Sequence, residues 1–197
     1  IPALDSGSLT EEDLVGLLRL AEEYGHQHIF LFKCPRETAA KLMASARVRR
    51  ILQAEGIQGV LSEPIFVETP VDPVIVDVRW ESRRGVDRLV VKGVETWQRQ
   101  VVAESKELAN GRFLRFQDEP SRTVQVAELH ANGLLELRLQ SRKKPDYTDE
   151  LASFWHLLGK IIPSGEFGIR DLEKLRDRLL KERRALVDEF SYSNAVL

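Results

Sequence analysis

Three clusters of basic residues are the parts of this sequence whose types and spacing suggest chemistry. They are Arg47, Arg49 and Arg50; Arg79, Arg83 and Arg84; and Arg138, Arg142, Lys143 and Lys144. Guanidinium and ammonium groups bind phosphate oxygens, and tryptophan side chains such as Trp80 or Trp97 stack on nucleic-acid bases. If a sheet brings the second and third clusters together, they predict a basic patch that follows a phosphate backbone.

The overall charge does not mark this chain as a binder of polyanions. It has 29 Lys and Arg residues against 31 Asp and Glu residues, for a formal net charge of -2. Any contact with nucleic acid must therefore come from a local patch. An ordinary solvated surface explains the basic clusters more simply, so nucleic-acid binding is the alternative hypothesis and not the first.

The histidines and the single cysteine offer one candidate metal set. His26 and His28 share one face of an extended strand, and two imidazoles with the Cys34 thiolate would suit zinc. No second cysteine or nearby histidine completes that set, so we expect no metal site. His130 and His156 have no Ser or Cys partner at a motif spacing, and both are interpreted as structural residues.

No stretch carries the signature of a nucleotide or cofactor site. The glycines at 56–59 and 165–168 lack the GxGxxG spacing and the Gly-Lys-Ser/Thr ending that hold phosphates. Acidic runs at 11–13 and 22–23 are explained by the helix dipole and by solvation. We therefore expect no cofactor and no catalytic residue, and the sequence favours a non-catalytic protein over an enzyme.

The strongest structural signal is a β-hairpin from Arg122 to Gln140. Leu135, Leu137 and Leu139 alternate with polar residues, which is the period of a strand with one buried face. Asn132-Gly133 supplies the turn, because Asn and Gly tolerate the positive φ that tight hairpin loops require.

The N-terminal part predicts a helix, a strand and a second helix. Thr10 can cap the first helix, and its apolar stripe (Leu14, Leu17, Leu18 and Ala21) ends at Gly25, which suits a left-handed cap. The unbroken apolar run at 29–32 favours a central strand covered on both faces. Pro35 fits the first position of a second helix that continues to Gly56.

A proline-rich stretch at 63–73 separates this part from the sheet region. Residues 74–81 and 87–92 alternate as two strands joined by a turn at Arg84-Gly85. Residues 94–109 fit a helix that ends at Asn110-Gly111, and equally a strand that reverses there; the apolar spacing slightly favours the helix.

The C-terminal part predicts two helices. One starts near Thr148 and turns Leu151, Phe154, Trp155 and Leu158 inward, and the other covers 169–190. The fold class is therefore α+β: an antiparallel meander of four to six strands, covered on one face by helices, with an N-terminal helix-strand-helix unit. The predicted domains are 1–62, the linker 63–73, and 74–197.

Composition and chain ends complete the expectations about function. One cysteine fits a reducing compartment, no apolar run is long enough to cross a bilayer, and cytoplasm is the default. The chain begins without Met, which suggests a piece of a longer protein. We expect a non-catalytic interaction or regulatory domain of a larger intracellular protein, whose partner is another protein or the rest of its own chain.

Overall fold

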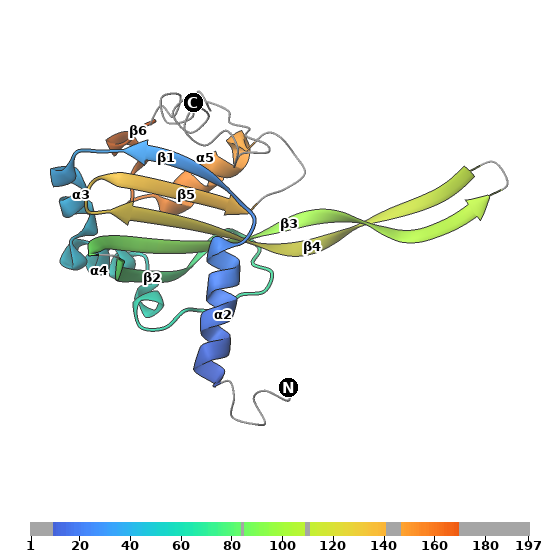
Figure 1. The fold of residues 1–197 in the computed structure, drawn as a ribbon, viewed down its shortest axis with the longest axis horizontal. Helices are drawn as coiled ribbons and strands as arrows, with labels where there is room; N and C mark the ends of the chain where they lie inside the picture. The colour runs from blue at the N-terminus through green and yellow to red at the C-terminus, as the bar shows by residue number, and fades with distance from the viewer. Residues whose placement is uncertain (1–9, 84, 109–110, 141–146, 170–197) are drawn as a thin grey trace, which may run out of the picture.

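A six-stranded antiparallel sheet forms the body of the protein, which confirms the predicted α+β class. The computed structural model describes residues 10–83, 85–108, 111–140 and 147–169. The strands are β1 (Gln27–Lys33), β2 (Val74–Arg83), β3 (Val86–Leu108), β4 (Gly111–His130), β5 (Leu134–Gln140) and β6 (Gly168–Ile169). Their order across the sheet is β2-β3-β4-β5-β1-β6 (Figure 1).

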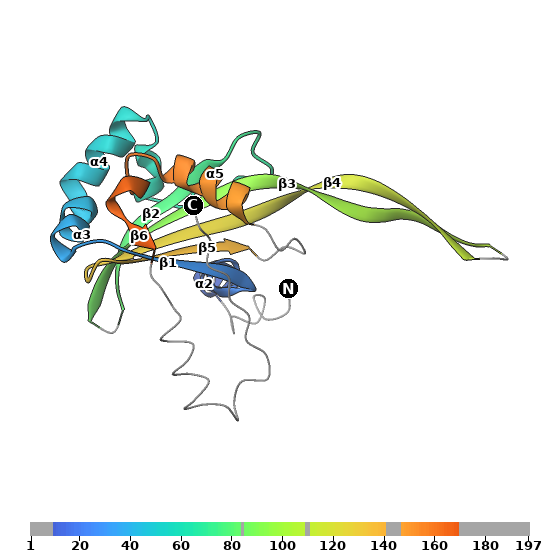
Figure 2. The same ribbon diagram turned by 90° about the horizontal axis from the view of Figure 1, so that it is seen from above.

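Helices lie on both faces of this sheet. They are α2 (Glu11–Tyr24), α3 (Arg36–Met43), α4 (Ser45–Ala54) and α5 (Thr148–Leu158), with short 3-10 turns at Gln58–Leu61 and Ser164–Glu166. Helices α3, α4 and α5 lie on one face, and α2 lies on the other (Figure 2). None of the helices within the described residues has the length and apolar character that crossing a bilayer requires.

The main hydrophobic core fills the space between the sheet and the helices α3, α4 and α5. Leu135 and Leu137 of β5 are fully buried there, together with Phe154 of α5 and Leu52 of α4. Residues from both sides of the proline-rich stretch share this core, and β1 pairs directly with β5. Strand β1 and the helices α3 and α4 are therefore part of the same sheet and core as the hairpin.

The hairpin of β4 and β5 confirms the strongest sequence prediction. Leu129 pairs with Leu135 across the turn, and Gly133 has a φ of +87°. A Cβ atom on Gly133 would lie 2.2 Å from the carbonyl oxygen of Cys34, whose backbone N–H donates to the Gly133 carbonyl oxygen at 3.0 Å. Both the turn and this close contact require glycine.

The predicted position of β1 is wrong, because the strand lies second from the edge of the sheet. Its outer neighbour β6 has only two residues. Phe32 is buried, whereas Ile29 is 53% exposed, so only one face of the strand is fully covered. The aromatic residues of the apolar run, Phe30 and Phe32, supply the side that packs on the core.

The predicted single helix from Pro35 to Gly56 is two helices, with a break at Ala44 (ψ 117°). Side chains outside α3 donate hydrogen bonds to the carbonyl oxygens at its end. Trp80 Nε1 donates to the Met43 carbonyl at 2.8 Å, and Arg47 donates to the Leu42 carbonyl at 3.2 Å. These donors satisfy groups that a continuous helix would have bonded internally.

Two further expectations about helices are corrected. Residues 94–108 do not form a helix, because they continue β3, which pairs with β4 as far as Leu108 opposite Gly111; residue 109 lies outside the described residues. The stripe of α2 does not pack inward, since Leu17 and Leu18 are 53% and 58% exposed. Gly25 has a φ of -68°, so the cap is not left-handed.

The ends of the remaining elements agree with the sequence where the structure describes them. Thr10 caps α2 through a capping box with Asp13. Helix α5 starts at Thr148, and its four predicted core residues are buried. The helix predicted at 169–190 lies outside the described residues, apart from Ile169, which belongs to β6.

Candidate functional site

Strands β3 and β4 extend far beyond their neighbours and form a two-stranded arm. β2 pairs with β3 only as far as Val94, and β5 pairs with β4 only from Gln125 onward. Beyond these points the two strands pair with each other, and Figures 1 and 2 show the resulting ribbon projecting from the body. We define the arm as residues 98–120, of which 109 and 110 lie outside the described residues.

One face of the arm carries an uncovered apolar patch. Val102 pairs with Phe116, and Leu114 lies two residues from Phe116 on the same face. Their exposed fractions are 50%, 53% and 39%, and Phe113 on the opposite face is 46% exposed. An isolated two-stranded hairpin is marginally stable in water. A partner that covers this patch would therefore stabilise the arm in addition to binding it.

The charges of the arm cancel. It holds four acidic residues (Glu104, Glu107, Asp118 and Glu119) and four basic residues (Arg99, Lys106, Arg112 and Arg115). A ribbon with this balance has no net attraction for a phosphate backbone. Its distinguishing feature is exposed apolar and aromatic area, which is typical of a protein contact surface.

The sheet face beneath α2 carries a continuous ion-pair network. Its members come from α2 and four strands: Glu22, Glu23, Asp77, Arg79, Glu81, Arg88, Lys92, Arg122, Glu128, Arg138 and Glu136. At its centre Glu128, with no exposed surface, lies 2.6 Å from Arg88 and 3.1 Å from Arg138. Buried charges of this kind require partners, because an unpaired one is strongly destabilising.

Two residues of the predicted basic patch belong to this network. Arg79 contacts Glu23 at 2.6 Å and also Asp77 and Glu81. Burial disfavours its charge, but the hydrogen bond to Glu81 and the other carboxylates outweigh burial and raise its pKa. Arg138 is buried against Glu128 and Glu136. Neither guanidinium projects freely toward solvent.

The structure does not place the whole basic patch. Only the backbone of Arg83 is described, and Arg84, Arg142, Lys143 and Lys144 lie outside the described residues. Arg83 ends β2 opposite Val86, at the same end of the sheet as the β4–β5 turn. Gln140 ends β5 at the opposite end of the sheet. The strand ends that lead into the two clusters therefore point in opposite directions.

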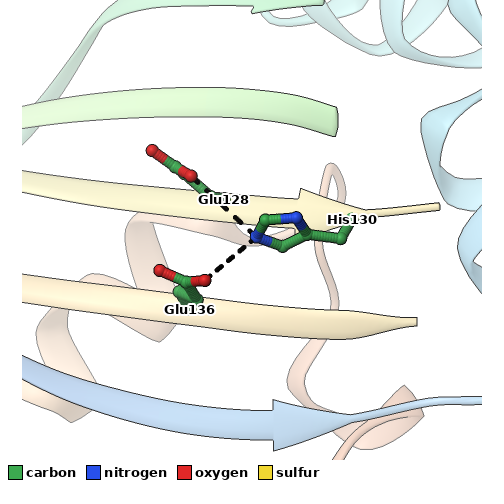
Figure 3. A group of neighbouring side chains, drawn as sticks. All are labelled: Glu128, His130 and Glu136. Carbon is green, nitrogen blue, oxygen red and sulfur yellow. Dashed lines mark hydrogen bonds and ion pairs between the residues drawn. The ribbon is translucent and has the colours of Figure 1, made fainter. Parts of the chain in front are cut away.

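His130 joins the network between two carboxylates. Its Nε2 atom lies 3.1 Å from Glu136 Oε1 and 3.9 Å from Glu128 Oε2 (Figure 3). The hydrogen bond with His130, opposed by burial and helped by Arg138, lowers the pKa of Glu136 to about 2. Glu128 and Glu136 are direct cross-strand partners, and such a pair of like charges is destabilising unless cations neutralise it.

A cleft of about 420 Å³ opens on this group. It is lined by Val86, Arg88, Glu128, His130, Asn132, Glu136 and Arg138. Within the described part of the chain, Glu128, His130 and Glu136 are the group whose ligand atoms converge closely enough to hold a metal ion, all within 4.8 Å of one another.

The sequence analysis missed these residues, although a signal was present. A hairpin centred on Asn132-Gly133 places residue 128 opposite residue 136, with His130 on the same face as Glu128. The set of His26, His28 and Cys34 does not converge. The His28 ring lies against Tyr147, with ring centroids 4.1 Å apart and a tilt of 37°, and Cys34 is buried beyond the far end of β1.

Comparison with known proteins places the chain in no family, since no family model, curated protein or solved structure matches it.

Proposed function

We propose that this chain is a non-catalytic protein-interaction domain and that the arm is its contact element. The observation that carries the proposal is the arm itself: a ribbon without neighbouring strands that exposes Val102, Leu114 and Phe116 on one face. The partner is a protein with a complementary apolar surface. The balanced charge of the arm supports a protein partner over a polyanion.

The magnitude of the expected contact follows from the exposed area. Fully burying a phenylalanine side chain contributes about 1.5–3 kcal/mol, and Phe116 keeps about half of its surface for a partner. Its share of binding is therefore about 1 kcal/mol or slightly more. Losing that contribution should weaken the complex roughly five- to tenfold.

The proposal is tested by replacing Phe116 with serine and comparing the variant with Val71→Ser. Val71 is 99% exposed in a loop of the body, so its replacement removes exposed apolar area outside the arm. Complexes are isolated under native conditions from the cells that produce the protein, and co-purified components are quantified by mass spectrometry. We expect a defined protein component that Phe116→Ser reduces and Val71→Ser leaves unchanged. Equal recovery with both variants would contradict the role of the arm.

Nucleic-acid binding through the basic patch is the alternative. It is less well supported, because Arg79 and Arg138 already contact carboxylates of the network. The test is a salt titration of DNA and RNA binding with the wild type and with a variant that carries Glu at 142, 143 and 144. If the patch binds phosphate, the variant binds all sequences more weakly and shows a flatter salt dependence. Binding that the variant leaves unchanged would remove the patch from consideration.

A further inference from the structure

The ligand atoms of Glu128, His130 and Glu136 lie where a small cation would bring them together. Zinc binds imidazole nitrogen and carboxylate oxygen at about 2.0–2.2 Å, so tetrahedral ligands lie about 3.4 Å apart. The Nε2 atom of His130 is already 3.1 Å from Glu136 Oε1 and 3.9 Å from Glu128 Oε2. The carboxylate oxygens of Glu128 and Glu136 lie within 4.8 Å of each other, so the side chains would have to close by up to about 1.4 Å to reach this spacing. The two strands that carry these residues are directly paired, so the three side chains start from adjacent backbone positions.

These residues also differ from the acidic groups of an ordinary surface. Glu128 is fully buried, and the side chains of His130 and Glu136 are only 17% and 19% exposed. Ligating carboxylates in metal sites are themselves hydrogen-bonded by outer partners that orient them. Here Arg138 bonds to both carboxylates, at 3.1 Å and 2.6 Å. In Glu136 this bond uses Oε2 and leaves Oε1 to face His130.

The charge of the network leaves room for a further cation. Its six carboxylates exceed its five Arg and Lys side chains by one when His130 is neutral. A metal ion bound to Nε2 would lie between the two carboxylates and offset part of their charge. The adjacent cleft leaves space for a ligand that is not supplied by these three residues. Zinc sites with three protein ligands leave the fourth position to water or to a bound ligand.

We propose that Glu128, His130 and Glu136 form a binding site for a divalent transition-metal ion of the zinc class, open to the cleft beside them. A nitrogen ligand with two carboxylate oxygens favours such ions over Ca²⁺, which takes six or more oxygen ligands. The site lies on the body of the sheet, apart from the arm, and it stands or falls independently of the proposed function.

The experiment is a calorimetric zinc titration of the full chain after treatment with a chelator. We expect one equivalent of zinc per chain, with at least about tenfold weaker binding for His130→Ala and for Glu136→Gln. His156→Ala is the matched control, since this exposed histidine lies on α5, on the opposite face of the sheet. A thermal melt of each variant without metal identifies any loss of binding that comes from unfolding.

X-ray absorption at the zinc edge reports the ligands directly and does not depend on the variants. The proposal predicts one imidazole and otherwise nitrogen or oxygen ligands, with no sulfur. A zinc–sulfur distance would assign the ion to Cys34 and overturn the proposal. Absence of binding at millimolar zinc, or equal affinity in wild type and His130→Ala, would overturn it as well.

Discussion

Replacement of Glu128 by glutamine tests whether the ion-pair network on the sheet face beneath α2 stabilises the fold. The side chain is 1% exposed and lies between the guanidinium groups of Arg88 and Arg138, at 2.6 Å and 3.1 Å. It also accepts a hydrogen bond from the hydroxyl of Tyr24, at 3.2 Å, which ties the end of α2 to β4. Glutamine keeps the volume and removes the charge, so packing is preserved while both ion pairs are lost.

The expected loss in the free energy of unfolding depends on the carboxylate partners that Arg88 and Arg138 retain. Removing one partner of a buried ion pair destabilises a protein by about 3–5 kcal/mol. Arg88 retains Glu81 and Arg138 retains Glu136, so neither cation is left without a carboxylate. We therefore expect the lower end, about 3 kcal/mol, which corresponds to a decrease in Tm of about 6–12 °C for a domain of this size.

The assay is urea and thermal unfolding in the presence of a chelator, so that metal binding does not contribute. The matched control is Glu104→Gln, which removes the exposed pair with Lys106 on the arm. We expect this control to change the free energy of unfolding by less than about 0.5 kcal/mol. A loss below about 1 kcal/mol for Glu128→Gln would refute the reasoning, because it would mean that desolvation cancels the attraction within the network.

Three further predictions concern the core, the pH dependence and the arm. Leu137→Asp should abolish the cooperative melt, because it places an unpaired charge at a fully buried position at a cost of several kcal/mol; a melt at the wild-type temperature would contradict the assigned inward face. The lowered pKa of Glu136 contributes stability that is fully present above the unfolded pKa of about 4.5 and is lost as pH falls toward 2. The Tm of Glu136→Gln should therefore fall less between pH 5 and 2.5 than that of the wild type, and parallel curves would exclude this contribution. Replacing residues 99–119 by Asn-Gly should change the stability of the body by less than about 1 kcal/mol, because the arm packs on no part of the core; urea unfolding checks this, and a larger loss would show that the arm supports the body.

Elements that are determined by residues within their own segment were predicted correctly. The hairpin of β4 and β5 depends on alternation and on Asn132-Gly133, which act over a few residues. The start of α2 depends on Thr10 and Asp13 in one turn, and α5 depends on the spacing of its own apolar residues. In each case the physical cause lies within the segment that it shapes.

Features that depend on distant partners were missed. The break at Ala44 is stabilised by Trp80, 36 positions along the chain, so no local propensity reveals it. The sequence suggested that Glu22 and Glu23 are solvated, because their cationic partners, such as Lys92 and Arg79, lie on strands far along the chain. These ion pairs and the burial of Glu23 follow from how the sheet places its cations beneath α2, and not from α2 itself.

The arm and the group of Glu128, His130 and Glu136 could be predicted only in part from the sequence. Val and Thr residues at 94–109 suit a strand as well as a helix, and only pairing with residues 111–122 decides between them. If that segment is a strand, then β3 must extend beyond β2, because β2 starts directly after Pro73. The opposition of Glu128 and Glu136 likewise follows from the predicted turn, but their arginine partners do not.

Site-specific photo-cross-linking tests the central claim, that the arm is the surface this protein uses to contact another protein. A photoreactive phenylalanine analogue is placed at Phe116 in one variant and at the exposed loop position Val71 in another, in the cells that produce the protein. We expect a discrete protein adduct from position 116 that is absent from position 71 and resistant to nuclease. Adducts of equal yield at both positions, or none at position 116, would contradict the account.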